Sequence, residues 1–182
     1  MPAPPGRIVC FGEAMLRESG GMITPGGAEF NVACALARIG TTSAWVSVLP
    51  EEETMIQSAA NDASVHLEIL LSKREIGRYT IDSATRSVVY DRKDSGFAHL
   101  NPRDFDWRAL LSGARWLVLS GITPLLGEGP RSAWGEALTF AELDGTLIAM
   151  DLNHRPALGK IDTLWEIIRP RMRMFNVLIL SA

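Results

Sequence analysis

The sequence predicts an α/β fold in which a doubly wound, mainly parallel sheet is interrupted by an antiparallel β flap. Short apolar runs recur along the chain, helical patterns fill most intervals between them, and one interval alternates at period two instead. Strands covered by helices on both faces have this near-continuous apolar character. The runs span residues 8–11, 44–49, 116–119, 147–150 and 177–180.

Three intervals carry the i, i+3, i+4, i+7 spacing of an apolar helix stripe. Gly40 and Gly145 follow two of the stripes at the position of a C-terminal cap, and Pro130 suits the first turn of the second helix. A weaker helical pattern covers residues 51–60. The stripes consist of Val32, Ala35, Leu36 and Ile39; of Trp134, Ala137, Leu138 and Ala141; and of Ile161, Leu164, Trp165 and Ile168.

The interval 65–92 differs because apolar and polar residues alternate and no helical pattern is present. Two β-rich runs, 76–81 and 86–92, follow an alternating segment in which every second side chain points the same way. We interpret the whole interval as an antiparallel meander, which predicts a flap inserted in the parallel sheet. The alternating apolar residues are Val65, Leu67, Ile69 and Leu71.

Length and composition limit the classes of protein that the chain can represent. Its 182 residues, 47% of them hydrophobic, are enough for one domain with a single core. The net charge is −3, and lysine and arginine are scattered rather than gathered on one predicted face. This distribution argues against a nucleic-acid partner.

Cysteine and histidine usage predicts neither a disulfide framework nor a metal site. Cys10 and Cys34 are the only two cysteines, and the three histidines lie in separate segments. Residues 1–6 contain three prolines, so we expect them to be disordered, and the apolar run that follows is too short for a signal peptide or a membrane span. We expect a cytoplasmic protein without a membrane partner.

Candidate binding residues follow the predicted strands, because open parallel sheets bind ligands beyond the carboxyl ends of their strands. Gly12-Glu13, Ser120-Gly121 and the segment 151–155 occupy such positions. The last segment brings a carboxylate, an amide and a guanidinium together after a buried strand. A polar strand end without a binding role is the alternative, and for Ser120 the two interpretations are equally favoured.

Gly26 and Gly27 precede a predicted helix and let the backbone pass close to a ligand, with helix N–H groups as donors. Asn31 follows them and either contacts the ligand or merely caps the helix. Neither the dinucleotide pattern G-x-G-x-x-G nor the P-loop pattern G-x-x-x-x-G-K-[ST] occurs. A nucleotide site here must therefore be of another type.

Within the predicted flap, Tyr79, Tyr90 and Arg92 place two phenols and a cation on neighbouring strands. Tyr90 and Arg92 share one face because they are two residues apart. Such a face suits a polar, oxygen-rich ligand. An ordinary half-buried sheet face with a cross-strand tyrosine pair remains the alternative.

Eight short segments occur in an order and spacing that are specific together. They are GE at 12–13, GGAEFNVA at 26–33, LARIG at 36–40, WVSVLP at 45–50, GRY at 77–79, VYDR at 89–92, SGITP at 120–124 and DLNHR at 151–155. With these segments the chain, from about Arg7 onward, resembles the ribokinase-like (PfkB) carbohydrate kinases, and most closely the 2-keto-3-deoxygluconate kinases.

The resemblance implies a fold, a substrate and a set of contacts. Residues 7–182 would be the N-terminal part of a ribokinase-like kinase domain whose sheet is incomplete, with β lid segments at about 14–25 and 65–100 that also serve in homodimerisation. The substrate would be a small-molecule sugar acid, with two arginines at its acid end, because a guanidinium binds a carboxylate through a planar fork of donors. The implied substrate-binding residues are Gly26, Gly27, Asn31, Tyr79, Tyr90, Arg92, Ile122, Thr123 and Arg155.

The resemblance also implies ATP and Mg²⁺ as cofactors and an aspartate base in a Gly-Ala-Gly-Asp motif of the C-terminal half. No such motif occurs in the 182 residues. We therefore expect substrate recognition, no catalytic residue in this chain, a largely absent nucleotide site, and no phosphoryl transfer by the chain alone. Three departures from the family pattern, at His154, Gly159 and 51–58, affect the expected wall of the cleft.

Two other functions remain open at this point. The first is a kinase for a neutral sugar such as ribose or fructose. The second, of another class, is a non-catalytic sugar-binding or dimerisation module that uses the flap and the open edge of the sheet.

Overall fold

Six parallel strands form the main sheet of the computed structural model, which describes residues 5–82, 85 and 87–180. Their spatial order is β10-β9-β8-β1-β4-β5. Each neighbouring pair is parallel, as the helical connections require. The strands are β1 (Ile8–Phe11), β4 (Ser43–Pro50), β5 (His66–Ser72), β8 (Trp116–Ser120), β9 (Leu147–Asp151) and β10 (Val177–Ile179).

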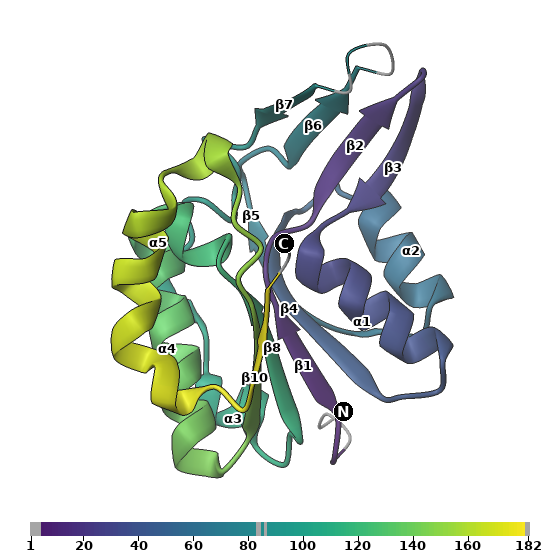
Figure 1. Cartoon of the computed structure of the whole chain (residues 1–182). Coiled ribbons are helices and arrows are strands. Elements are labelled where there is room, and N and C mark those ends of the chain that lie inside the picture. The colour runs from purple at the N-terminus through teal and green to yellow at the C-terminus, as the bar shows by residue number, and fades with distance from the viewer. Residues whose placement is uncertain (1–4, 83–84, 86, 181–182) are drawn as a thin grey trace.

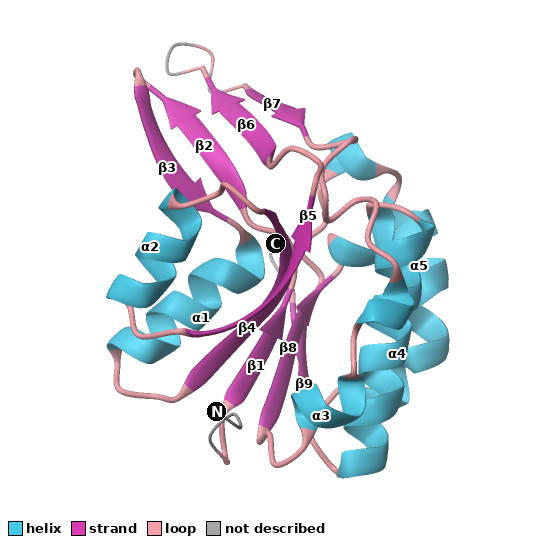
Figure 2. Cartoon of the chain, turned by 180° about the vertical axis from the view of Figure 1, so that it is seen from behind, coloured by secondary structure: helices cyan, strands magenta, loops and turns pink. Residues whose placement is uncertain are grey.

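Helices cover both faces of this sheet (Figure 1). Helices α1 (Ala28–Arg38) and α2 (Met55–Asp62) lie on one face. Helices α3 (Trp107–Leu111), α4 (Glu128–Asp144) and α5 (Ile161–Ile168) lie on the other, as the view from behind also shows (Figure 2). Short 3₁₀ turns are η1 (Pro102–Asp104), η2 (Thr123–Leu125), η3 (Pro156–Leu158) and η4 (Arg169–Met174). The predicted doubly wound α/β fold is confirmed.

Each face of the main sheet has its own apolar core, because successive side chains of a strand point to opposite faces. In β1, Val9 and Phe11 pack under α3 and α4, whereas Cys10 packs under α1 and α2. Phe11 lies at the centre of an aromatic group, with ring centroids 4.9 to 5.5 Å from those of its neighbours. These neighbours are Phe97, Phe105 and Trp107.

A second, four-stranded sheet stands beyond the carboxyl ends of the main strands (Figure 1). Its order is β3-β2-β6-β7, and it consists of β2 (Met15–Ser19), β3 (Met22–Gly26), β6 (Gly77–Ile81) and β7 (Val88–Asp91). The two outer pairs are antiparallel and the central pair, β2 with β6, is parallel. We call this four-stranded sheet the lid.

The expectation that the whole interval 65–92 forms a flap is wrong for its first part. β5 pairs with β4 in the main sheet, so only β6 and β7 of this interval belong to the lid. Period-two alternation marks any half-buried strand, and β5 is such a strand because it lies at the edge of the main sheet. Most of its residues are half-buried: Leu67 and Ile69 pack against the core on one face of the sheet, and Leu70 packs against the core on the other.

The apolar stripes of the helices are confirmed in part. All four predicted residues of α4 are buried, and Gly145 ends that helix in the left-handed conformation. In α1 the predicted stripe is wrong, because Val32 and Ile39 are exposed. In α5, Ile161 and Trp165 of the predicted stripe are likewise exposed. The residues of α1 that are buried are Glu29, Phe30, Ala33 and Cys34.

At the N-terminus, residues 1–4 of the segment expected to be disordered lie outside the described residues. The expectation does not hold for Gly6, whose N–H donates to Gly113 O at 2.7 Å.

Within the described ranges, we find no helix that is both long and apolar enough to cross a membrane.

Candidate functional site

The candidate site lies where the lid meets the carboxyl ends of the main strands. From β1 the chain proceeds outward to β4 and β5 in one direction, and from β8 it proceeds to β9 and β10 in the other. The strand order therefore reverses between β1 and β8. Ligands of open α/β sheets bind in the crevice at such a reversal.

Gly26 and Gly27 connect the lid to helix α1 on one side of this crevice. Gly27 is the N-terminal cap residue of α1, with φ at 151°, and a β-carbon there would lie 2.6 Å from Glu13 O. Glycine is therefore required at this position. Asn31 lies inside the helix, donates its N–H to Gly27 O at 2.9 Å and is exposed. The alternative in which Asn31 only caps the helix is thus wrong, and its role in binding stays a prediction.

The two lid tyrosines are neighbours, as predicted. Tyr79 of β6 is paired with Tyr90 of β7, and their ring centroids are 5.8 Å apart. The Tyr79 hydroxyl lies over Gly26, where a β-carbon would come within 2.6 Å of it. Burial raises the pKa of Tyr79, while the positive charges of Arg17 and Arg155 oppose this shift. The Tyr79 hydroxyl therefore lies over the glycine turn, within range of the Arg155 charge.

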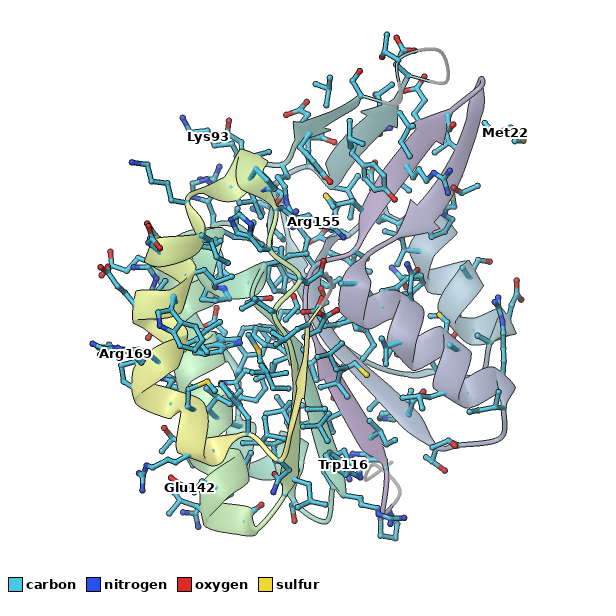
Figure 3. The ribbon with its side chains drawn as sticks, viewed as in Figure 1. Met22, Lys93, Trp116, Glu142, Arg155 and Arg169 are labelled. Carbon is cyan, nitrogen blue, oxygen red and sulfur yellow. The ribbon has the colours of Figure 1, made fainter. Side chains whose placement is uncertain are left out.

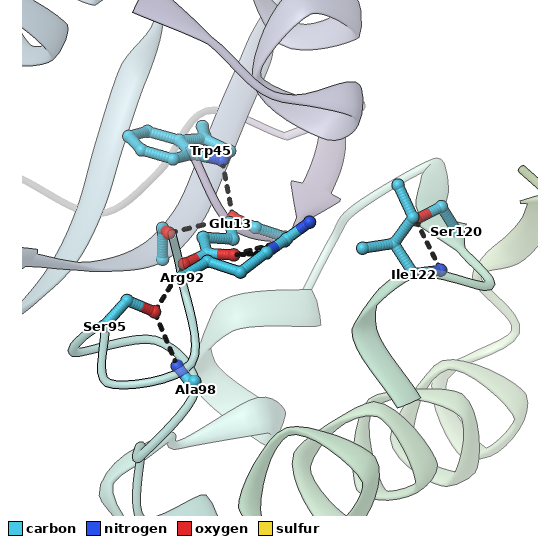
Figure 4. Close-up of polar contacts among 9 residues, drawn as sticks. Glu13, Trp45, Arg92, Ser95, Ala98, Ser120 and Ile122 are labelled. Carbon is cyan, nitrogen blue, oxygen red and sulfur yellow. Dashed lines mark hydrogen bonds and ion pairs between the residues drawn. The ribbon is translucent and has the colours of Figure 1, made fainter. Parts of the chain in front are cut away.

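Arg92 does not face an open acid-binding position, contrary to expectation. Its guanidinium is buried and forms an ion pair with Glu13, in which Arg92 Nε donates to Glu13 Oε2 at 2.8 Å (Figure 4). Ser95 Oγ donates to the other carboxylate oxygen at 2.5 Å. The Arg92 guanidinium carbon is 6.0 Å from the Tyr90 ring centroid. The sequence could not show this pairing because it joins two residues 79 positions apart.

Glu13 is the partner that the sequence left without a role. Burial raises the pKa of this carboxyl, and the charge of Arg92 and the Ser95 hydroxyl oppose the shift. Ser95 Oγ also accepts the Ala98 N–H at 3.2 Å, so the same group orders the turn after the lid. The network joins the end of β1 to the base of the lid.

The loop after β9 leaves one cation exposed. Asp151 Oδ1 accepts the Asn153 N–H at 3.0 Å, and His154 Nε2 lies 2.9 Å from Gly159 O. These side chains therefore order the loop itself rather than converging on a ligand. Arg155 is exposed, and its side chain forms no ion pair within the described part of the chain. Figure 3 places it between the main sheet and the lid.

The turn after β8 carries two predicted substrate-binding residues, which differ in how deeply they are buried. Ile122 is half-buried, but Thr123 is fully buried and its hydroxyl has no hydrogen-bond partner in the described ranges. Thr123 is therefore not on the surface of a cleft in this conformation. Ser120 Oγ accepts the Ile122 N–H at 3.2 Å, which fixes the turn (Figure 4).

The amino-acid sequence of residues 3–170 matches the family described as pfkB family carbohydrate kinase. The chain belongs to this family. A 2-dehydro-3-deoxygalactonokinase of Haloferax volcanii is 32% identical over 172 residues, which cover 83% of this chain and 53% of that protein. Fructokinase-2 of Oryza sativa subsp. japonica is 40% identical over 172 residues, or 84% of this chain and 51% of that protein.

Among solved structures, the 2-dehydro-3-deoxygluconokinase of Thermotoga maritima matches with a TM-score of 0.88 and 34% identity. The match covers 95% of this chain and 59% of that one. The chain thus spans about half the length of the curated relatives it matches. The predicted ribokinase-like relationship and the similarity to the kinases of 2-keto-3-deoxy sugar acids are confirmed.

Glu29 is a site feature of this pfkB chain that the sequence analysis missed. It stands in the first turn of α1 and is buried, and a β-carbon on Gly12 would overlap its carboxyl. The Ser120 side chain and backbone lie near enough to lower the pKa of this carboxyl, so Glu29 lies by the ends of both β1 and β8 at the reversal of strand order. Its Oε1 atom has no hydrogen-bond partner among the described residues.

The environment of Glu29 makes its carboxyl a weaker acid than usual. Burial raises its pKa to about 7, although Ser120 and, at longer range, Arg92 oppose the shift. The buried Cys10 thiol faces it from β1, and the pKa of that thiol is raised by burial and by the Glu29 charge. An acidic residue in the first turn of a helix is normally a surface feature that complements the helix dipole, so no sequence signal marked this one.

The described residues do not fit a resident metal. No group of three or more histidine, cysteine, aspartate or glutamate side chains is placed to hold one in the described part of the chain.

Proposed function

We propose that the chain provides the sugar-binding part of a kinase for a sugar acid, with 2-keto-3-deoxygluconate (2-dehydro-3-deoxygluconate) as the leading substrate. The observation that supports this is Arg155, an exposed guanidinium without an ion pair in the described ranges, which faces the Tyr79 phenol. A carboxylate is the complement of such a guanidinium, and hydroxyl groups suit the two phenols. Gly26, Gly27, Asn31 and Ile122 complete the proposed contacts.

The expected pair of arginines is reduced to one in this conformation, because Arg92 is held by Glu13. In our proposal Arg92 supports the base of the lid and orients Tyr90, and Arg155 binds the acid end. Thr123 contributes only if the turn after β8 shifts on binding.

Phosphoryl transfer from ATP, with Mg²⁺, is the activity that we propose for the whole protein. The relatives at 32% and 40% identity are kinases by name, and the 182 residues lack a Gly-Ala-Gly-Asp motif. We expect no turnover from these residues alone. Phosphorylation of 2-keto-3-deoxygluconate by the purified chain that disappears in Arg155→Ala would contradict this part.

The binding proposal is tested by thermal shift, since a ligand that binds only the folded state raises the unfolding temperature. We expect 2-keto-3-deoxygluconate to stabilise the wild-type chain and to lose most of this effect in Arg155→Ala. Arg169→Ala removes an exposed arginine far from the lid and is the control (Figure 3). Equal stabilisation of both variants would contradict the role of Arg155.

A neutral sugar such as fructose is the second candidate substrate. It is favoured by the fructokinase-2 relative and by the burial of Arg92, which removes one cation from the site. Stabilisation by fructose that is unchanged in Arg155→Ala would support this candidate instead.

Homodimerisation through the lid is a further part of the proposal. The apolar Val89 and Ile23 are exposed, and both lie on the lid face opposite the tyrosines. We expect Val89→Lys to shift a dimer toward monomer in sedimentation velocity, and identical profiles would count against this interface.

Two buried, unpaired cysteines fit a reducing compartment, and we propose a cytoplasmic location.

A further inference from the structure

A continuous row of polar side chains crosses the lid on the face of Tyr79 and Tyr90. Residues directly opposite one another in paired strands share a face of the sheet. Thr24 of β3 is opposite Arg17 of β2, Arg17 is opposite Tyr79, and Tyr79 is opposite Tyr90. The row therefore places a third arginine, Arg17, directly beside the phenol of the candidate site.

The adjacent row of paired residues lies on the other face of the lid. Leu16, Arg78 and Asp91 are paired across β2, β6 and β7 and occupy the opposite face. Leu16 and Arg78 line a cavity of about 640 Å³ that also includes Glu52 and Lys73, on the side away from the glycine turn. Arg17, in contrast, shares its face with Tyr79, whose hydroxyl lies over Gly26.

The charge of Arg17 is available to a ligand. Its side chain is exposed and has no ion pair or hydrogen bond in the described part of the chain. Its positive charge lowers the pKa of Tyr79 more than that of Arg155 does, which agrees with the register. Two exposed guanidinium groups thus act on one phenol from two elements, Arg17 from the lid and Arg155 from the loop after β9.

We propose that Arg17 is a specificity-determining residue of the site, which binds the carboxylate of a sugar acid together with Arg155 across the Tyr79 ring. This rests on the proposed sugar-acid function and deepens it. Arg17 then supplies the second cation that the buried Arg92 does not supply. Because Arg17 stands on the lid, its contact also holds the lid against the main sheet when an acid is bound.

Titration calorimetry with three forms of the 182-residue chain tests this proposal. The forms are the wild type, Arg17→Ala and the control Arg78→Ala, which removes the neighbouring exposed arginine of the other face. We expect Arg17→Ala to weaken 2-keto-3-deoxygluconate about tenfold, as for the loss of a hydrogen bond to a charged group. Fructose affinity should not change in either variant.

The outcomes separate this inference from the function on which it rests. If the wild type binds no sugar acid, the proposed function fails and the role of Arg17 fails with it. If the wild type binds the acid and Arg17→Ala binds it equally well, the function stands and the role of Arg17 is overturned.

A ligand-free measurement adds a second test. The chain has two tyrosines, both in this row, so its phenolate absorbance titration reports on the site alone. Removing a nearby cation raises the pKa of a phenol. We expect the titration of Arg17→Ala to move to higher pH than that of Arg78→Ala. Coincident curves would show that the Arg17 charge does not face Tyr79 and would overturn the proposal.

Discussion

Two buried glutamates flank Gly12, and they are stabilised in different ways. Glu13 is matched by a full positive charge, since Arg92 and Ser95 donate to its two oxygens. Glu29 has Ser120 nearby but no ion pair in the described ranges, and one of its oxygens has no hydrogen-bond partner there. Burial costs a carboxylate several kcal/mol, which either a counter-charge or a proton must offset.

The two acids hold different parts of the site in place. The ion pair of Glu13 ties the end of β1 to the base of the lid, where Tyr90 and Arg92 are placed. Glu29 lies between the same strand end, the end of β8 and the first turn of α1, without a counter-charge in the described ranges. We therefore expect the free energy of unfolding to fall when the Glu13–Arg92 pair loses one of its charges. For variants of Glu29, we expect the change in the free energy of unfolding to depend on pH.

The largest effect is expected from Arg92→Met. This change leaves the buried Glu13 without its counter-charge, and breaking one side of a buried pair costs about 3–5 kcal/mol. The measurement is urea unfolding at neutral pH. The double variant Glu13→Gln/Arg92→Met should recover part of the loss, and the exposed control Arg78→Met should change the free energy of unfolding by no more than about 0.5 kcal/mol. An equal effect of Arg92→Met and Arg78→Met would disprove the importance of the pair.

Glu29→Gln should change the free energy of unfolding by an amount that varies with pH, by on the order of 2–3 kcal/mol between pH 5 and pH 8. The pKa of Glu29 is raised by folding from its ordinary value of 4.5 to about 7, so the folded chain holds a proton that the unfolded chain releases. This stabilisation is full below the unfolded pKa and is lost as the pH rises through about 7.

Unfolding between pH 5 and pH 8 measures the effect. We expect the wild type to lose stability relative to Glu29→Gln as the pH rises. Parallel wild-type and Glu29→Gln profiles would mean that Glu29 does not exchange a proton in this range.

Gly12→Ala should be destabilising by about 1–3 kcal/mol, because its β-carbon would overlap the Glu29 carboxyl. Thermal unfolding should show a smaller cost of the same change in a Glu29→Ala background. Gly135→Ala, in a helix position with room for a methyl group, should instead stabilise the chain by roughly 0.5–1 kcal/mol. An equal cost of Gly12→Ala in both backgrounds would argue against the contact.

The sequence predicted the fold well because its strongest signals are local. The apolar runs, the glycine cap at Gly145 and the stripe of α4 depend on residues close in the chain. The stripe of α1 was misassigned because a second stripe, one containing Phe30 and Cys34, satisfies the same helical period. Only the position of α1 on the sheet decides between them.

The site was predicted less completely, because its polar contacts join distant residues. Tyr79 and Tyr90 were placed together correctly, since one hairpin pairs them. Arg92 was assigned to the ligand because the sequence gives no measure of its distance from Glu13. Arg17 was overlooked because its relation to Tyr79 depends on the parallel pairing of β2 with β6.

The affinity of the chain for 2-keto-3-deoxygluconate relative to fructose tests the central claim most directly. Titration calorimetry of both ligands in one buffer measures it. With Arg155 and Arg17 at the site, we expect the sugar acid to bind at least about tenfold more tightly than fructose, and added salt to reduce this preference. Equal or tighter binding of fructose would contradict the assignment of this site to a sugar acid.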